Sequence, residues 1–480
     1  MSFTLAELRE GTSGRALFAQ RESFPGASID SRGLEPGEVF FALRGEKRDG
    51  HDYAEAALAQ GAGGVVIAAE RAEPALLHRL RRFGRCAIVA VDEPQAALAR
   101  AGAFRRSQLP ALQVAAVTGT NGKTTTKQIL SALLATQGSV LATKGNLNNH
   151  LGVPLTLLSL ENAHRFAVIE MGASGPNEID FLAGLVRPKV CVLTNVAPSH
   201  LDGYGSLEVL RRSEAEVLRH IPLSGTFVVN ADDPSCVAIG REFQGNILKF
   251  SLKSSPGVDV CASEITPSGV DGMSFVLRAA GESRHVRLPL VGEHNVSNAL
   301  AASGCALALG LDLASIVPAL EKVRPAEMRS EVHVAADGTV VFLDCYNANP
   351  LSMSRALEAL VRMEGPGRKV AVLGQMNELG AQAREFHRAL GGEAARLGID
   401  WLLYTGEWAA EVVEAARAAG LPRAESFPSH GEILSALARD REAGERILVK
   451  GSRGARMERV ARQLLGRVRE GASASAGEAH

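Results

Sequence analysis

The chain has 480 residues, of which 46% are hydrophobic and 22% are charged, and its formal net charge is −1. A chain of this length exceeds what one hydrophobic core usually holds, so we expect several domains. The near-zero charge, without long runs of either sign, argues against nucleic acid as a partner. No apolar run reaches the roughly 18 residues that a membrane span needs, and residues 1–10 lack the pattern of a signal peptide.

The six cysteines are scattered along the chain and no Cys-x-x-Cys occurs, which is typical of reduced thiols rather than of disulfides or a zinc site. We therefore expect a cytoplasmic protein without membrane insertion. Short Val/Ile/Leu runs alternate with helical Ala/Leu/Arg patterns, which predicts an α/β fold. We divide it into three domains, residues 1–107, 108–325 and 326–480, and expect residues 471–480 to be a disordered tail.

The first domain has the pattern of a small α/β unit. Its expected elements are strands at 39–43, 65–68 and 86–91 and a helix that Asp52 caps. Ser31 and Arg32 precede the first of these strands. Their position alone indicates a turn residue and a surface charge.

The second domain begins with the most specific motif of the chain. A β-prone run at 114–118 leads into Gly119-Thr120-Asn121-Gly122-Lys123-Thr124-Thr125, and a helical pattern follows to Ala135. The two glycines let the backbone curl so that its N–H groups point at a phosphate chain, and the helix N-terminus adds partial positive charge. Lys123 supplies a full charge, and the Thr124 hydroxyl is placed to ligate Mg²⁺. Although Val117 replaces the first glycine of the full phosphate-loop pattern, the segment predicts a nucleotide site.

Polar residues follow the expected strands of the same domain. They are Asn146, Asn148 and Asn149 in a loop before a helix-like segment, Glu170 after the strand 166–169, and His200 after the strand 190–193. Open α/β sheets bind ligands at the carboxyl ends of their strands, so these side chains are candidates for substrate or metal contact. Glu170 is a natural partner of Thr124 on Mg²⁺. The alternatives are ordinary turns for the asparagines and a surface or capping role for His200.

Further candidates lie toward the end of the chain. Asn295 and Asn298 are three residues apart, so they share a helical face and either cap it or read adenine edges. In the third domain, strands at 340–343, 370–373 and 447–450 each end in a polar loop, and a helix is expected at 351–362. Asp344, Asn347 and Asn349 belong to the first of these loops. Three such loops predict one binding rim.

In this order the motifs resemble those of the Mur ligases, the ATP-dependent amide-forming enzymes of bacterial peptidoglycan synthesis. The shared passages are residues 119–125, 170–172, 200, 292–302, 327–331 and 344. Residues 30–32, 37–43, 146–154, 346–350 and 450–453 resemble the member that acts last in the cytoplasm. The Asp-Asn-Pro motif of the preceding ligase does not occur, and a full domain precedes the phosphate loop, unlike in folylpolyglutamate synthase.

The resemblance implies an activity. ATP would phosphorylate the terminal carboxylate of UDP-N-acetylmuramoyl-tripeptide, and the amine of D-alanyl-D-alanine would attack the acyl phosphate. It also implies an N-terminal UDP-substrate-binding domain, a central P-loop ATPase-like domain and a C-terminal Rossmann-like domain, whose closure excludes water from the acyl phosphate. ATP and Mg²⁺ are the implied cofactors, and we expect a monomer.

The resemblance also assigns roles residue by residue. Lys123 would neutralise the transferred phosphoryl group, and Arg329 would reach the γ-phosphate on closure. Thr124 and Glu170 would hold one Mg²⁺, and His200 would hold a second. The implied contacts to substrates are Asn295 and Asn298 to adenine, Asp344 to the ribose region, Ser31 and Arg32 to uridine diphosphate, and Asn347 and Asn349 to D-alanyl-D-alanine.

Some positions depart from the family. Glu214 stands where relatives commonly carry a carbamylated lysine, and we expect its carboxylate to take over that role toward Mg²⁺, with a solvated helix charge as the alternative. Gln375 and Asn377 replace expected acidic residues, and Cys345 replaces an expected serine. A ligase with another amino-acid acceptor and a nucleotide-dependent switch or binding protein are the competing functions.

Overall fold

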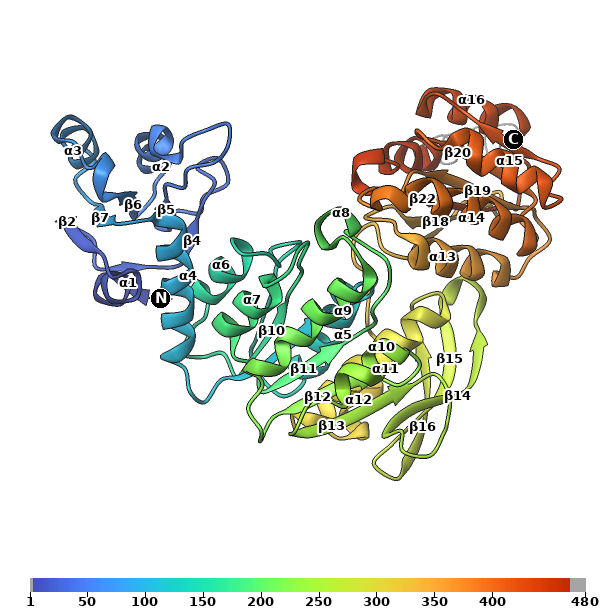
Figure 1. Cartoon of the computed structure of the whole chain (residues 1–480), viewed down its shortest axis with the longest axis horizontal. Coiled ribbons are helices and arrows are strands. Elements are labelled where there is room, and N and C mark those ends of the chain that lie inside the picture. Colours follow the sequence, from blue (N-terminus) through green and yellow to red (C-terminus); the bar gives the residue numbers. More distant parts are fainter. Residues whose placement is uncertain (1–2, 467–480) are drawn as a thin grey trace, which may run out of the picture.

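The computed structural model describes residues 3–466, which form three α/β units in chain order (Figure 1). Each unit is built on its own sheet, of five, nine and six strands. The first and third units lie at opposite ends of the molecule in Figure 1, with the middle unit between them. The expected three-unit α/β architecture is confirmed, and the expected tail at 471–480 lies outside the described residues.

The first unit has a five-stranded sheet in the order β2-β7-β6-β5-β4, with β2 antiparallel at one edge. The strands of this sheet are β2 Arg15–Ala19, β4 Ala27–Ser28, β5 Val39–Phe41, β6 Gly64–Ala68 and β7 Ala87–Val91, and β1 Phe3–Thr4 and β3 Ser23–Phe24 pair in a separate antiparallel two-stranded sheet. Its helices are α1 Leu5–Thr12, η1 Gly50–Tyr53, α2 Ala54–Ala59, η2 Ala69–Arg71, α3 Pro74–Arg81 and α4 Pro94–Ser107. Strands β5 to β7 are buried along their length, as parallel strands covered on both faces require.

The prediction that Asp52 caps the helix at α2 is wrong by three positions. A single 3-10 turn precedes α2, and its cap is Asp49, whose carboxylate accepts the N–H of His51 over 3.0 Å. An aspartate caps best from just before the turn, because its side chain then reaches a free N–H two residues on. Asp52 lies inside the turn and cannot do this.

The middle unit has a nine-stranded sheet in the order β16-β15-β14-β13-β12-β11-β8-β10-β9. Its strands are β8 Gln113–Thr118, β9 Val140–Ala142, β10 Phe166–Glu170, β11 Val190–Leu193, β12 Thr226–Asn230, β13 Asn246–Ser251, β14 Val260–Pro267, β15 Met273–Ala279 and β16 Glu282–Leu288. The order from β14 to β9 is parallel, and β8 lies between β10 and β11. The antiparallel extension through β15 and β16 was not predicted from the sequence.

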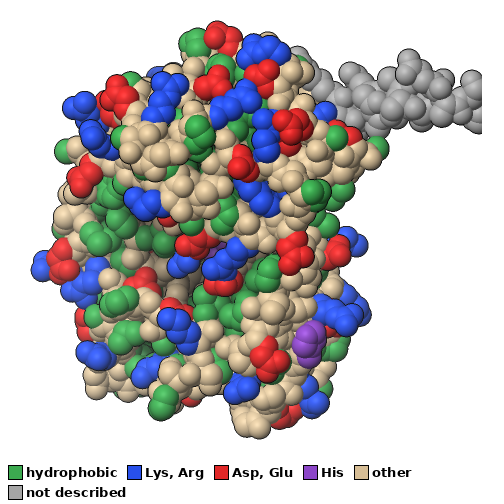
Figure 2. Space-filling view, turned by 90° about the vertical axis from the view of Figure 1, so that its right-hand side faces the viewer, with side chains coloured by type: hydrophobic (Ala, Val, Ile, Leu, Met, Phe, Trp, Pro, Cys, Tyr) green, Lys and Arg blue, Asp and Glu red, His purple; other side chains and the backbone are tan. Residues whose placement is uncertain are grey.

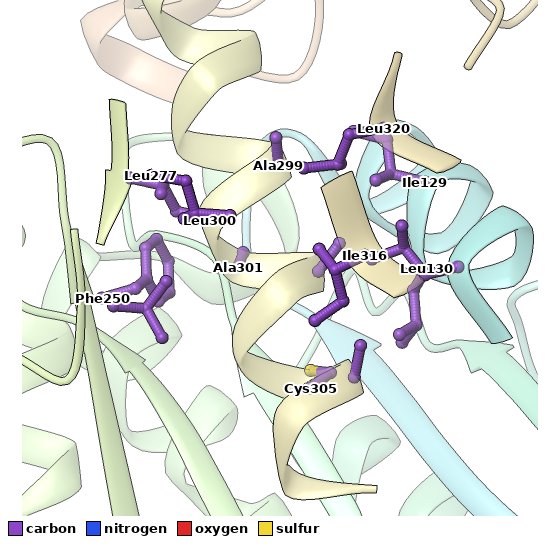
Figure 3. Close-up of a cluster of buried hydrophobic side chains, with 14 of the residues drawn as sticks. Ile129, Leu130, Phe250, Leu277, Ala299, Leu300, Ala301, Cys305, Ile316 and Leu320 are labelled. Carbon is purple, nitrogen blue, oxygen red and sulfur yellow. The ribbon is translucent and has the colours of Figure 1, made fainter. Parts of the chain in front are cut away.

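The helices of the middle unit are α5 Lys123–Ala135, α6 Gly152–Leu158, α7 Glu178–Val186, α8 Leu201–Tyr204, α9 Leu207–Ala215, η3 Glu216–His220, α10 Pro234–Gly240, η4 Gly269–Asp271, α11 Glu293–Ala308 and α12 Leu313–Leu320. Figure 3 shows α11 packed between α5 and α12 on one side and β13 and β15 on the other. The small side chains of Ala299, Ala301 and Cys305 let the helices approach closely. This buried packing fixes the first turns of α11 beneath the phosphate loop.

The third unit has a six-stranded sheet in the order β17-β18-β22-β19-β20-β21, with only its edge strand β17 antiparallel. Its strands are β17 Glu331–Val334, β18 Val340–Asp344, β19 Lys369–Gly374, β20 Trp401–Thr405, β21 Ala424–Ser426 and β22 Arg446–Lys450. Its helices are α13 Pro350–Arg362, η5 Gly380–Gln382, α14 Ala383–Arg396, α15 Ala409–Ala418, α16 His430–Asp440 and η6 Arg453–Ala455.

The surface agrees with the even charge balance of the sequence. On the face shown in Figure 2, basic and acidic side chains are interspersed. Within residues 3–466 we find no helix whose length and apolar character would let it span a bilayer.

Candidate active site

A cavity of about 810 Å³ lies where the carboxyl edge of the middle sheet faces the third unit. It brings together most of the residues that the sequence singled out. Its lining includes Thr120, Asn121, Gly122, Lys123, Thr124, Thr125, Asn146, Asn148, Asn149, Glu170, His200, Asn295, Asn298, Arg329, Asp344, Asn347 and Asn349. The cavity therefore joins the phosphate loop to the rim of the third unit, as the positions after the strands predicted.

The phosphate loop joins β8 to α5, and its two glycines are required by their surroundings. Gly119 has a φ of +114°, and a Cβ there would lie 2.4 Å from the Thr194 hydroxyl oxygen. Gly122 has a φ of +80°, and a Cβ there would lie 2.2 Å from Oδ1 of Asn298. Both positions exclude a side chain on steric grounds as well as by backbone conformation.

The loop is also held from the neighbouring strand end, through a residue that the sequence reading left without a role. The backbone oxygen of Asn195 accepts the N–H of Thr120 over 2.8 Å, and its Oδ1 accepts the N–H of Asn121 over 3.0 Å. Asn195 follows β11, which lies beside β8 in the sheet. The contact is visible only after folding, because the two segments are more than 70 residues apart.

Lys123 begins α5 and turns back over its own loop. Its Nζ donates to the backbone oxygens of Gly119 over 2.6 Å and Thr120 over 3.0 Å. Burial lowers the pKa of Lys123, whereas the nearby carboxylates of Glu214 and Glu170 act in the opposite direction. The ammonium group thus lies within the curl of the phosphate loop, where it can neutralise a bound phosphate.

Glu170 ends β10 and gathers three partners around its carboxylate. Thr124 donates its hydroxyl to Oε1 over 3.1 Å, Asn148 donates Nδ2 to the same oxygen over 2.8 Å, and Lys127 Nζ lies 3.2 Å from Oε2. Burial alone would raise the pKa of Glu170, but Lys127, Lys123 and the Asn148 hydrogen bond lower it overall. The side chain is therefore a carboxylate at neutral pH.

The Thr124 and Glu170 pair has the donor set that Mg²⁺ uses at a nucleotide site. Within the described residues, no cluster of three or more His, Cys, Asp or Glu side chains could hold a metal by itself. Mg²⁺ usually takes one or two carboxylates and completes its octahedron with water and nucleotide oxygens. One hydroxyl and one carboxylate beside a phosphate loop fit that chemistry.

His200 faces the same cavity but makes its closest polar contact across the cleft. It precedes α8 with a φ of +50°, and its Nδ1 lies against the carboxylate of Glu378 in the third unit. The backbone oxygen of Glu378 also accepts the N–H of Leu201 over 2.9 Å. The sequence reading placed Glu378 in a polar loop without giving it a role, and the expected metal contact of His200 stays a prediction.

Glu214 is buried on α9, so the alternative of a solvated helix charge is wrong. Its Oε2 accepts the Thr118 hydroxyl over 2.7 Å. Burial raises the pKa of Glu214, and the charge of Lys123 lowers it. The side chain does not line the cavity, so it lies behind the phosphate loop and acts on that loop through Thr118 and Lys123.

Asn295 and Asn298 form a pair within α11, directly beneath the phosphate loop. Asn295 donates Nδ2 to the backbone oxygen of Val291 over 2.8 Å, and Asn298 donates Nδ2 to Oδ1 of Asn295 over 3.1 Å. Oδ1 of Asn298 accepts the Thr126 hydroxyl over 3.4 Å. These bonds indicate support of the loop, and adenine recognition by these residues stays a prediction.

The third unit presents a cationic face to the cavity. The Arg329 guanidinium stacks 4.0 Å above the ring of Tyr346. Lys450 forms an ion pair with Asp344 and donates to the backbone oxygen of Asn347 over 3.0 Å. Lys450 and Tyr346 lie in passages that resemble the family, but the sequence predicted no role for either. In the structure the buried Lys450 fixes the Asp344 loop.

Two other candidates lie elsewhere. Arg32 is 82% exposed and pairs with Asp30 over 2.7 Å, and neither Ser31 nor Arg32 lines the cavity. Asn149 lines it, but its Oδ1 accepts the N–H groups of Leu151 over 3.2 Å and of Gly152 over 2.9 Å in the turn before α6. The expected uridine diphosphate contact of Ser31 and Arg32 therefore stays a prediction about a separate surface.

Comparisons with known proteins agree with this architecture. The Mur ligase family, catalytic domain, matches residues 24–106, the Mur ligase middle domain matches residues 117–306, and the Mur ligase, glutamate ligase domain, matches residues 328–453. The UDP-N-acetylmuramoyl-tripeptide–D-alanyl-D-alanine ligase of Escherichia coli K12 is 34% identical over 468 residues, covering 97% of this chain and 98% of that enzyme.

Two solved structures extend the similarity to three dimensions. MurF from Acinetobacter baumannii is 34% identical, with a TM-score of 0.85, and the match covers 97% of this chain and 99% of that one. MurF from Thermotoga maritima in complex with ADP is 28% identical, with a TM-score of 0.77, and the match covers 92% and 97% of the two chains.

Proposed function

The chain belongs to the Mur ligase family, and from this premise we propose that it joins D-alanyl-D-alanine to UDP-N-acetylmuramoyl-tripeptide and converts ATP to ADP and phosphate. The product is UDP-N-acetylmuramoyl-pentapeptide, a precursor of peptidoglycan. The observation that carries the proposal is the cavity in which Lys123, Thr124 and Glu170 face the loops of the third unit, in a chain similar over its length to ligases of this name.

The first step is phosphoryl transfer. An oxygen of the tripeptide carboxylate attacks the γ-phosphorus of ATP. The bond between the γ-phosphorus and the bridging oxygen of the β-phosphate breaks, which gives ADP and an acyl phosphate. Two anions must approach each other, so the site has to supply positive charge. Lys123 and the N–H groups of the phosphate loop provide it on one side, and Arg329 provides it on the other. A magnesium ion held by Thr124 and Glu170 would neutralise the phosphate oxygens further.

The second step forms the amide. The amine of D-alanyl-D-alanine attacks the acyl carbon, phosphate leaves, and the nitrogen loses a proton. We assign the dipeptide to the loop with Asn347 and Asn349, and the tripeptide end to the loop with Asn146 and Asn148. The first unit, with Ser31 and Arg32, is assigned to the uridine diphosphate end of the substrate. Both steps need a dry cavity, since water hydrolyses an acyl phosphate.

The same proposal includes where and in what form the enzyme works. We propose that the enzyme works as a monomer. The six cysteines are free and buried, which supports the reducing environment of the cytoplasm. Sedimentation of the purified protein tests the first of these assignments.

The direct test supplies ATP, UDP-N-acetylmuramoyl-tripeptide and D-alanyl-D-alanine and follows both ADP release and product mass. We expect one ADP for each pentapeptide, and Lys123→Ala should lower turnover by about 100-fold to 1,000-fold, as loss of one preorganised charge does. Product with another amino acid but not with D-alanyl-D-alanine would identify a ligase with a different acceptor. ADP release that ignores both other substrates would identify a nucleotide switch.

A further inference from the structure

The two carboxylate oxygens of Glu170 have different surroundings. Oε1 accepts hydrogen bonds from the Thr124 hydroxyl and from Asn148, and Glu170 lines the cavity. Oε2 is buried, makes no hydrogen bond to the described residues, and faces Lys127 Nζ at 3.2 Å. Lys127 thus interacts with the second oxygen as an ion pair without a hydrogen bond.

Lys127 is fixed behind the carboxylate. It lies one helical turn after Lys123 on α5, only 6% of it is exposed, and it does not line the cavity. Its Nζ also donates to the backbone oxygen of Thr143 over 2.8 Å. The Thr143 hydroxyl in turn accepts the N–H of Glu170 over 3.0 Å, so lysine and carboxylate are held by the same segment. Glu170 therefore has little freedom to turn its second oxygen toward the cavity.

Carboxylate geometry distinguishes the two common hard cations. Mg²⁺ requires a near-ideal octahedron at about 2.0–2.1 Å and takes carboxylates through one oxygen. Ca²⁺ accepts about six to eight oxygens at longer distances and often takes both oxygens of a carboxylate. A carboxylate whose second oxygen is paired with a lysine can therefore still bind Mg²⁺ through one oxygen, but it cannot bind Ca²⁺ through both.

We propose that Lys127 is a positioning residue that holds Oε2 of Glu170, so that only Oε1, beside the Thr124 hydroxyl, is left to ligate a cation, and that it thereby selects Mg²⁺ over Ca²⁺ at the nucleotide site. This inference rests on the proposed function, because the cation concerned is the one that accompanies ATP. Lys127 itself contacts neither the nucleotide nor the metal.

The test measures cation affinity in the full-length protein. MgCl₂ and CaCl₂ are titrated calorimetrically into ADP-saturated protein, with the heat of binding to free ADP subtracted. Lys127→Met removes the charge and should strengthen Ca²⁺ binding relative to Mg²⁺ binding by about 10-fold or more. Groups behind metal ligands exert effects of this size. Lys127→Arg, which keeps the charge, should shift it much less.

Lys127→Gln keeps a hydrogen-bond donor for Thr143 without the charge, and it replaces Lys127→Met if that variant does not fold. Lys189→Met is the matched control, because Lys189 bonds to Gln113 at the opposite end of the sheet strands. An unchanged Mg²⁺ to Ca²⁺ ratio in a folded, ADP-binding Lys127→Gln or Lys127→Met variant would overturn the inference alone. Failure of the proposed function shows differently, because wild-type protein would then make no pentapeptide in the ligation assay, whatever its ratio of Mg²⁺ to Ca²⁺ affinity.

Discussion

Asn349 of the third unit donates a hydrogen bond from Nδ2 to Oδ1 of Asn121 in the phosphate loop, over 2.8 Å. Asn349 also caps α13, where its Oδ1 accepts the N–H of Ser352 over 2.9 Å. The Nδ2 of Asn121 is buried and has no hydrogen-bond partner among residues 3–466. One asparagine pair therefore ties the nucleotide loop to the first turn of a helix in another unit.

Asn349→Ser separates the two roles of this residue, because serine is also a good helix cap but is too short to reach Asn121. We expect kcat/KM of the ligation to fall about threefold to tenfold, the value of one neutral hydrogen bond, with little change in the melting temperature. Steady-state kinetics and calorimetry check this. Asn349→Ala should lose stability as well, and equal kinetics of wild type and Asn349→Ser would refute the coupling.

Glu214 should matter most when Mg²⁺ is scarce. Glu214→Ala removes the acceptor of the Thr118 hydroxyl and the carboxylate beside Lys123. Turnover at limiting Mg²⁺ should fall at least about 10-fold, since both groups position the phosphate loop. Glu208→Ala on the exposed side of the same helix is the control and should be near wild type. Unchanged kinetics of Glu214→Ala would reject any role in the site.

Asn298 offers a choice between two roles. If it supports the phosphate loop through Thr126 and Gly122, Asn298→Ala should weaken ATP and GTP binding by the same factor. If it reads adenine, only the preference for ATP should decline. We expect the equal effect, about threefold to tenfold for each nucleotide, because its amide is bonded within the protein. Fluorescence titration with both nucleotides decides the matter.

The buried His294 should make the protein less stable at acidic pH. Burial lowers the pKa of His294 to about 4, whereas an unfolded chain has about 6.5. As pH falls through this interval, the histidine binds a proton in the unfolded state but stays neutral in the folded state. The free energy of unfolding therefore decreases. Because the side chain is partly open to the cavity, we expect a loss of about 1 kcal/mol between pH 7.5 and pH 5.

Calorimetry at the two pH values measures this effect against His294→Gln. The glutamine variant cannot titrate, so its transition midpoint should fall less on acidification than that of the wild type. Identical falls would show that the His294 ring is accessible to protons in the folded protein.

The sequence by itself was sufficient for the phosphate loop and for the strands that come before and after it along the chain. A loop of this type is built from consecutive residues, so glycine spacing, Lys123 and the hydrophobic run before it specify the structure locally. The same holds for the residues that follow strands, such as Glu170 and Asp344, because the carboxyl ends of parallel strands must meet at one edge. Nearly all these candidates line one cavity.

Only the tertiary structure decided which groups stand next to one another. Lys127 behind Glu170, Glu378 on His200 and Asn349 on Asn121 join segments 43, 178 and 228 residues apart. No periodicity or spacing encodes such pairs, because they depend on how layers and units pack. For the same reason the sequence left an exposed helix charge open as the alternative for Glu214, and only the packing of α9 places this side chain, buried, beneath the phosphate loop beside Thr118.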